Sequence, residues 1–144
     1  MWFGTKDGPG IDKGGMRSIF EWDRACNPKY ECGEFLINGD QATVIMREEN
    51  DFTRLLDFAG WETKLNFRFT PDGKIKEELA ILLGSGPSFE EKLQPALDWL
   101  IANYPDDLAE IYPNNQFVFS GENARRWIGL LREWRRATNR PIAD

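Results

Sequence analysis

Two long segments of alternating apolar and polar residues, joined by one tight turn, constrain the fold more than any other feature. Trp61–Thr70 and Lys74–Leu83 flank Pro71-Asp72-Gly73. Proline presets φ for a turn and glycine accepts a positive φ, so these three residues predict a hairpin. Within Trp61–Thr70 the alternation is typical of an antiparallel strand with one face buried and the other in water. We therefore expect an antiparallel sheet with one apolar face.

A second hairpin and several helical patterns accompany this one. Tyr30–Ile37 and Gln41–Asn50 flank Asn38-Gly39-Asp40, whose Asn-Gly pair favours a hairpin turn. Ser88 followed by Glu91 predicts a helix start with a capping box. Apolar residues at helical spacing predict helices over Met16–Asn27, from Phe89 to Tyr104, over Asp106–Tyr112 and over Gly121–Thr138, with a short helical turn within Asp51–Gly60. Strands grouped between helices predict an α+β fold.

Histidine is absent from all 144 residues, which removes whole classes of chemistry. Ser-His-Asp and Cys-His catalysis and histidine-ligated zinc all require it. Cys26 and Cys32 cannot form a zinc site alone, and their spacing matches no metal or redox motif. We therefore expect no metal, no cofactor and two free thiols, as in a reducing cytoplasm.

Charge and hydropathy limit the expected partners. The net charge of −6 does not favour nucleic acid. No apolar run approaches the ~20 residues of a membrane span and no signal peptide opens the chain, so we expect a cytoplasmic protein without a membrane partner. Residues 120–144 differ, with six arginines and three acidic residues. We interpret these arginines as a solvated face that docks on the protein's own acidic residues, since no aromatic residues are interleaved with them as in nucleic-acid sites.

Three stretches resemble the nuclear transport factor two-like superfamily, also described as SnoaL-like or ketosteroid isomerase-like: Lys13–Asp23 (KGGMRSIFEWD), Asn38–Leu56 (NGDQATVIMREENDFTRLL) and Asp72–Gly84 (DGKIKEELAILLG). The resemblance covers about residues 1–84. It implies a curved antiparallel sheet forming a cone around helices, an apolar pocket and a homodimer. The N-terminal helices usual in that superfamily are missing here. We therefore expect a cone-shaped domain over residues 1–84 and a helical C-terminal extension over residues 85–144, packed on the same domain to cover the open cone.

The catalytic residues of the superfamily do not carry over to this chain. In ketosteroid isomerases the general base follows the first strand, and the matching stretch, Trp2–Thr5, has no carboxylate. The aspartate of their oxyanion hole falls at Leu65, and the acid of SnoaL-type cyclases falls at Leu83. The resemblance thus implies a pocket without either known mechanism.

Two carboxyls remain as catalytic candidates, Glu77 and Glu48. Glu77 alternates with Ile75 and Leu79 on a face expected to look inward, where lost hydration would raise its pKa toward neutrality. The alternative is that Glu77 pairs with an arginine or lysine. Glu48 and Asn50 share a face, where they could orient a water or, alternatively, cap the helical turn that follows.

The remaining candidates would line the pocket. The ligand-binding candidates are Met46, Asn50, Trp61, Leu65, Phe67, Leu79 and Asp23. The apolar members could equally form a plain core. Asp23 lies in the apolar stripe of its helix and either points toward the pocket or bonds a neighbouring arginine at the stripe's edge.

Two classes of function fit this pattern. The first is a small-molecule-binding domain with an apolar pocket for an apolar or amphipathic ligand. If catalytic, it would be a cofactor-free isomerase, dehydratase or hydrolase with Glu77 and Glu48 as acid and base. The second is a non-catalytic protein-interaction or dimerisation module with a filled pocket. An open cavity of about 300 Å³ or more with an unpaired carboxyl would favour the first, and a filled cone with Glu77 in an ion pair would favour the second.

Overall fold

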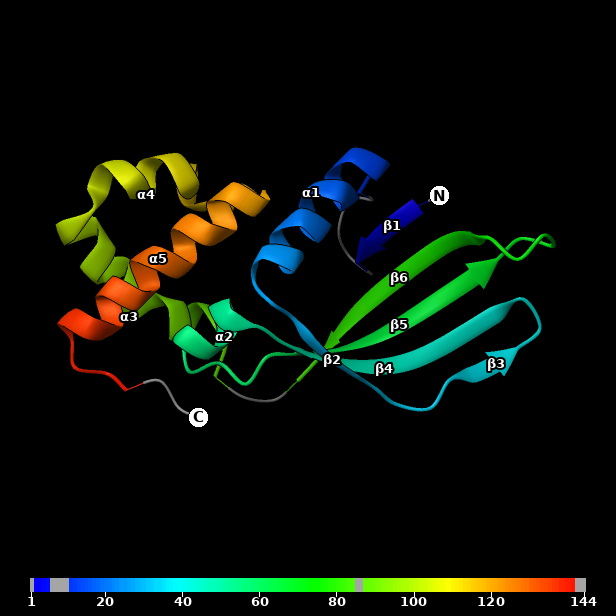
Figure 1. The fold of residues 1–144 in the computed structure, drawn as a ribbon. Coiled ribbons are helices and arrows are strands. Elements are labelled where there is room, and N and C mark those ends of the chain that lie inside the picture. The colour runs from blue at the N-terminus through cyan, green and yellow to red at the C-terminus, as the bar shows by residue number, and fades with distance from the viewer. Residues whose placement is uncertain (1, 6–10, 85–86, 142–144) are drawn as a thin grey trace. The chain divides into compact units, whose positions relative to one another are not determined.

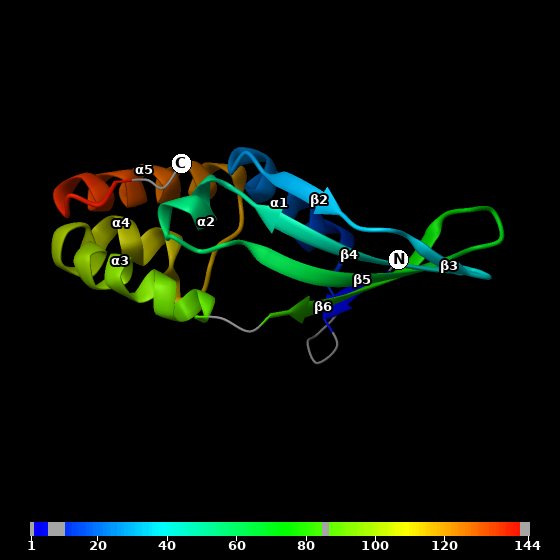
Figure 2. The same cartoon turned by 90° about the horizontal axis from the view of Figure 1, so that it is seen from below.

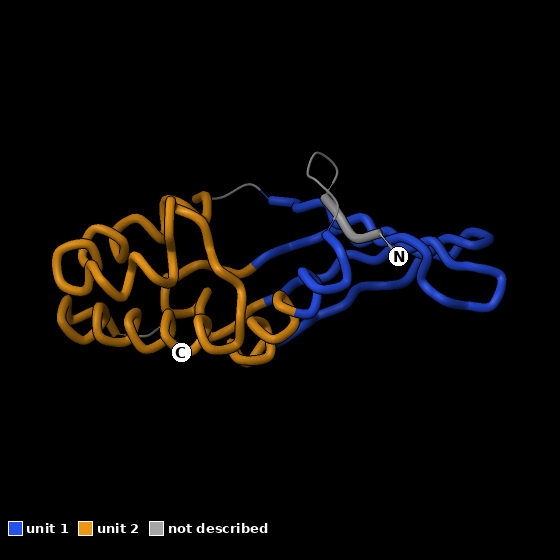
Figure 3. Tube along the Cα trace, turned by 90° about the horizontal axis from the view of Figure 1, so that it is seen from above, with its two compact units in different colours: residues 1–17, 29–48, 61–85 blue, residues 18–28, 49–60, 86–144 orange. Residues whose placement is uncertain are grey.

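The computed structural model describes residues 2–5, 11–84 and 87–141, which group into two compact units (Figure 3). The sheet unit comprises residues 1–17, 29–48 and 61–85, and the helical unit comprises residues 18–28, 49–60 and 86–144. Each unit is therefore assembled from three separate segments of the chain. The packing of residues 85–144 on a domain formed by residues 1–84 stays a prediction.

The sheet unit is built on three long antiparallel strands that bend along their length, β4 (Gln41–Glu49), β5 (Trp61–Phe69) and β6 (Ile75–Leu83) (Figures 1 and 2). The short strand β1 (Trp2–Thr5) pairs in parallel with β6. The other two short strands, β2 (Lys29–Cys32) and β3 (Leu36–Asn38), both pair with β4. Tyr30–Ile37, predicted as one strand, is thus two, and Gly33 lies at the break, as is common for a glycine within a strand.

Both hairpin turns form where the sequence predicts them. Gly39 and Gly73 adopt φ values of 60° and 79°, which glycine reaches without the steric cost that a side chain would bring. The predicted fold class is confirmed: the chain is α+β, with a curved antiparallel sheet and C-terminal helices.

A bulge between β5 and β6 decides which side chains share a face of the sheet. Phe69 lies opposite Ile75 and Arg68 lies opposite Glu77, so Lys76 is an extra residue on β6. One extra residue reverses the alternation of the side chains that follow it. The expectation that Ile75, Glu77 and Leu79 share one face is therefore wrong.

The register defines an apolar face and a polar face of the sheet. The apolar face carries Ile37 of β3, Ala42, Val44 and Met46 of β4, Trp61, Thr63, Leu65 and Phe67 of β5, and Glu78, Ala80 and Leu82 of β6. The polar face carries Leu36, Thr43, Ile45, Arg47, Glu62, Lys64, Asn66 and Arg68, together with Glu77, Leu79, Ile81 and Leu83. On the polar face, the Thr43 hydroxyl donates to the side-chain oxygen of Asn66 at 3.0 Å.

The helical unit holds the main hydrophobic core. It contains most of α1 (Lys13–Ala25) and all of α2 (Asp51–Leu55), α3 (Phe89–Asn103), α4 (Pro105–Ile111), the 3-10 turn η1 (Pro113–Asn115) and α5 (Gly121–Ala137). Its largest fully buried side chains include Trp127, Trp134, Leu56, Leu93, Leu100, Ile111 and Leu131. In the sheet unit, by contrast, only Ala42, Val44 and Thr63 are buried among the described residues.

Side-chain caps begin α3 and α5 of this unit, and the cap of α3 is one that the sequence predicts. The Ser88 hydroxyl accepts a hydrogen bond from the backbone N–H of Glu91, and the Glu91 carboxylate accepts one from the backbone N–H of Ser88. This is the predicted capping box of α3. Ser120 caps α5 through the backbone N–H of Asn123.

Two of the arginines expected on a solvated face, Arg126 and Arg135, pair with acidic residues of the same unit, but Arg135 is not solvated. Arg126 bonds Asp107 at 3.1 Å and Glu110 at 2.8 Å, which joins α5 to α4. Arg135 is buried and lies 3.0 Å from the Asp57 carboxylate. Among the described helices, none is both long and apolar enough to cross a membrane.

Candidate functional site

An apolar groove lies in the sheet unit, near the two hairpin turns. Its volume is about 380 Å³. The residues that line it are Phe35, Ile37, Gly39, Gln41, Ala42, Phe67, Phe69 and Ile75. Five of these eight are large apolar side chains, and these five come from the segment before β3 and from β3, β5 and β6.

The bulge gives this groove part of its wall. Because Lys76 is the extra residue, Ile75 lies opposite Phe69 and joins the apolar face. Phe67 and Phe69 lie two positions apart on β5, and their ring centroids are 6.4 Å apart. The ends of β5 and β6 next to their turn thus carry a cluster of aromatic and branched side chains.

Glu78 is the carboxyl that the register places beside the groove. It lies directly opposite Phe67, and Phe67 lies directly opposite Ala42, so the three form one row across the apolar face. Burial raises the pKa of the Glu78 carboxyl above its usual value. Within the described residues its side chain has neither an ion pair nor a hydrogen bond.

Glu77, the sequence-based candidate, lies on the polar face instead. Its carboxylate is 3.3 Å from Nη1 of Arg68, its cross-strand neighbour, and its side chain is 41% exposed. Leu79 lies on the same face, opposite Asn66. The alternative that Glu77 pairs with an arginine is the one that the structure shows.

Glu48 lies far along the strands from both Glu77 and Glu78. It is opposite Trp61, whereas Glu78 is opposite Phe67, six residues further along β5. At ~3.3 Å per residue these two rows are roughly 20 Å apart. Glu48 and Glu77 are therefore too far apart to act as acid and base on the same bond of a bound ligand.

Four of the five apolar candidates, all but Leu79, share a face, but they do not all belong to the groove. Met46, Trp61, Leu65 and Phe67 are all on the apolar face. Only Phe67 lines the groove. Whether the others contact a ligand stays a prediction.

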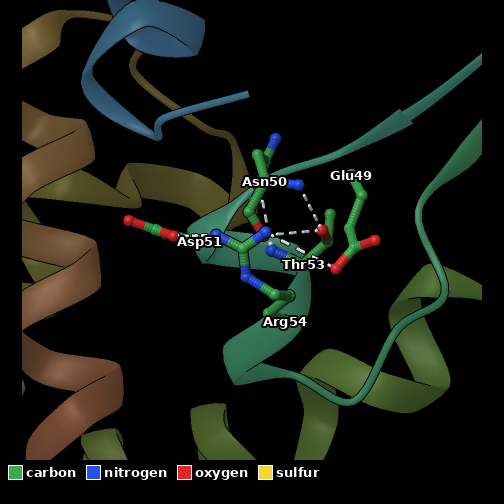
Figure 4. A network of polar contacts seen from close by, with 5 residues as sticks. All are labelled: Glu49, Asn50, Asp51, Thr53 and Arg54. Carbon is green, nitrogen blue, oxygen red and sulfur yellow. Dashed lines mark hydrogen bonds and ion pairs between the residues drawn. The ribbon is translucent and has the colours of Figure 1, made fainter. Parts of the chain in front are cut away.

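Asn50 has the capping role that was the alternative to a binding role. Its side-chain oxygen accepts from the backbone N–H of Thr53 at 2.9 Å, and its own N–H donates to the Thr53 hydroxyl at 3.0 Å (Figure 4). These two bonds form a capping box at the start of α2. Nearby, Arg54 pairs with Asp51 and with Glu49. Asp23 is half-buried on α1, in the helical unit.

The described residues hold no cluster of three or more side chains suited to a metal ion. Cys26 is buried and Cys32 is exposed, and neither forms a disulfide.

Sequence reasoning missed Phe35, Ile37, Ile75 and Glu78. Phe35 and Ile37 alternate just before the first turn, and this pattern could have placed both side chains on one face. Ile75 was expected to face inward, as it does, but it was not among the ligand-binding candidates. Glu78 could not be placed, because its face depends on the bulge at Lys76.

Comparison with known proteins assigns neither a family nor an activity. No known family and no curated protein matches the chain. Among solved structures, the chain is similar to AclR from Streptomyces galilaeus, a proposed hydroxylase, at a TM-score of 0.46 and 15% sequence identity. The match covers 57% of this chain and 59% of AclR, so this chain spans less than two thirds of that protein.

Proposed function

We propose that this chain is a binding domain for an apolar or amphipathic small molecule, held in the groove of the sheet unit. The observation that carries this proposal is the groove itself, about 380 Å³ in volume and lined mainly by apolar side chains. Ligand pockets typically have volumes of about 300–1,000 Å³ and predominantly apolar walls.

The unpaired carboxyl beside the groove supports the same function. An open cavity with an unpaired carboxyl is the criterion that favours a ligand site over a filled cone. Glu77, for which an ion pair is the opposite criterion, is paired with Arg68, so the support here comes from Glu78 on the apolar face. The resemblance of residues 1–84 to the nuclear transport factor two-like superfamily also supports it, because those domains hold apolar ligands against a curved sheet. The proposal is for binding, since no second carboxyl of the described residues on the apolar face is close enough to act with Glu78.

The test compares two neighbouring surface residues with opposite orientation. Ile37 lines the groove and is 76% exposed, whereas Leu36 faces the other way and is 66% exposed. The wild type, Ile37→Glu and Leu36→Glu would be screened by thermal shift against uncharged steroids, fatty alcohols and polycyclic aromatics. A ligand at ~100 times its Kd stabilises the protein by about 2.7 kcal/mol, a shift of several degrees.

We expect Ile37→Glu to abolish the ligand-induced shift and Leu36→Glu to retain it. A flat response of the wild type to the whole panel would overturn the proposal. Equal losses in both variants would also contradict it, because only one of the two side chains points into the groove.

A second candidate function is a protein-interaction surface along β3. Phe35, Leu36 and Ile37 are three consecutive exposed apolar residues, the last two of them on β3 at the edge of the sheet. Unprotected strand edges pair readily with other chains. If this surface mediates homodimerisation, light scattering should show a dimer for the wild type and a monomer for both Leu36→Glu and Ile37→Glu.

A further inference from the structure

We propose that the ligand of the groove is an amphipathic amine, whose cationic head pairs with Glu78 while its apolar body lies against Phe67 and the other groove residues. This inference rests on the proposed function and specifies the chemical class of the ligand.

The first support is the position of Glu78 in a cross-strand row that runs through the groove and continues to Phe3 of β1. Ile37, Ala42, Phe67 and Glu78 are successive cross-strand partners on the apolar face, on β3, β4, β5 and β6. The first three of them line the groove. Direct partners on one face have Cβ atoms about 4.5–5.5 Å apart, so the Glu78 side chain begins next to the Phe67 ring.

The second support is the missing partner of Glu78. Neighbouring carboxylates are paired: Glu77 with Arg68, and Asp72 with Lys74 at 2.7 Å. Glu78 is half-buried, and the described residues offer it no cation and no hydrogen-bond donor. A carboxylate that loses hydration without a partner is destabilised, and burial accordingly raises the pKa of Glu78.

A cation supplied by the ligand would remove this penalty. An ammonium group donates up to three hydrogen bonds and is strongly attracted to a partly desolvated carboxylate. A carboxylate head group would instead be repelled, and a hydroxyl head group would bring no charge. The net charge of −6 adds a general attraction for cations, which makes a local control necessary.

The experiment uses three probes that share one chain and differ in the head group: octylamine, octanol and octanoate. Binding to the full chain would be measured by calorimetry at pH 7.5 and about 0.15 M salt, where long-range attraction is screened beyond ~8 Å. The wild type would be compared with Glu78→Gln and with Glu77→Gln. The control Glu77→Gln removes the same charge one residue away, on the opposite face.

We expect the wild type to bind octylamine about five- to tenfold more tightly than octanol, and octanoate least tightly, as for a charge-assisted bond that is partly exposed. Glu78→Gln should bring octylamine and octanol within about twofold of each other. Glu77→Gln should keep the preference for the amine.

Other results would contradict the ligand class, the role of Glu78 or the groove itself. If octanol binds and octylamine binds no better, the ligand class is wrong and the groove proposal stands. If the preference for the amine survives Glu78→Gln, or disappears equally in Glu77→Gln, Glu78 is not the site of the ammonium group. If none of the three probes binds, both this inference and the proposed function fail for ligands of this kind.

Discussion

Arg135 offers the sharpest test of how the helical unit is held together. Its side chain is 4% exposed, and Nη1 donates to the carbonyl oxygen of Leu55 at 2.9 Å. Leu55 is the last residue of α2, where carbonyl groups lack partners within the helix. The guanidinium also lies 3.0 Å from the Asp57 carboxylate and donates to the carbonyl oxygens of Arg140 and Pro141. Arg135 therefore joins α5 to the end of α2.

The cost of Arg135→Met can be worked out from these contacts. Methionine keeps most of the apolar stem, so the change mainly removes the polar contacts. A net charge-assisted hydrogen bond contributes about 1.5–3 kcal/mol, and the bond to the buried Leu55 oxygen is of this kind. The Asp57 side chain is 42% exposed, so this ion pair adds at most ~1 kcal/mol. Since desolvation of the arginine offsets part of the sum, we expect a loss of roughly 2–3 kcal/mol.

The assay is urea unfolding followed by tryptophan fluorescence, because Trp22, Trp127 and Trp134 all lie in the core of the helical unit. The control is Arg136→Met, which removes a neighbouring arginine whose side chain is 73% exposed and whose only ion pair among the described residues is with Glu133. Removal of an exposed pair should cost less than ~0.5 kcal/mol. If both variants lose the same stability, or if Arg135→Met loses less than ~0.5 kcal/mol, the buried contacts do not stabilise the unit as argued.

Two further predictions concern Asn50 and Glu78. Asn50→Ala should cost about 1–2 kcal/mol in the same unfolding assay, because it removes the cap of α2 in a buried setting, and a loss below ~0.3 kcal/mol would contradict the capping role. Burial raises the pKa of Glu78 above 4.5 in the folded chain, so the folded state binds its proton more tightly than the unfolded state does. Stability should therefore fall as the pH rises from 4.5 through the raised pKa, and Glu78→Gln should remove this fall in unfolding experiments at a series of pH values. An unchanged pH dependence in the variant would refute the assignment to Glu78.

Local signals in the sequence were enough to predict most of the elements. The turns around Gly39 and Gly73, and the cap formed by Ser88 and Glu91, depend on residues close together in the chain. Their physical causes are backbone conformation and short-range hydrogen bonds, which the sequence displays directly. The capping role of Asn50 was foreseen as an alternative for the same reason.

Burial of charged side chains was harder to predict, because it depends on contacts between distant segments. Arg135 follows Leu131 by four residues and Ile128 by seven, so helical spacing places it on the apolar stripe of α5. Its charge suggested a solvated position like that of Arg136. What permits its burial is the end of α2, whose carbonyl oxygen lies eighty residues earlier in the chain.

The most consequential error in the sequence-based site came from one extra residue. Strict alternation along β6 assigned Glu77 to the buried face, and the bulge at Lys76 transfers that position to Glu78. The two adjacent glutamates therefore have different environments: Glu77 is paired with Arg68 on the polar face, and Glu78 is beside the apolar groove. Since they differ in environment and not in chemistry, any functional difference between Glu77→Gln and Glu78→Gln must come from the face of the sheet on which each lies. Comparison of the two variants therefore tests the register of β6 against β5. If Glu77→Gln, and not Glu78→Gln, weakens ligand binding, then Glu77 lies opposite Phe67 and β6 pairs with β5 without the bulge at Lys76.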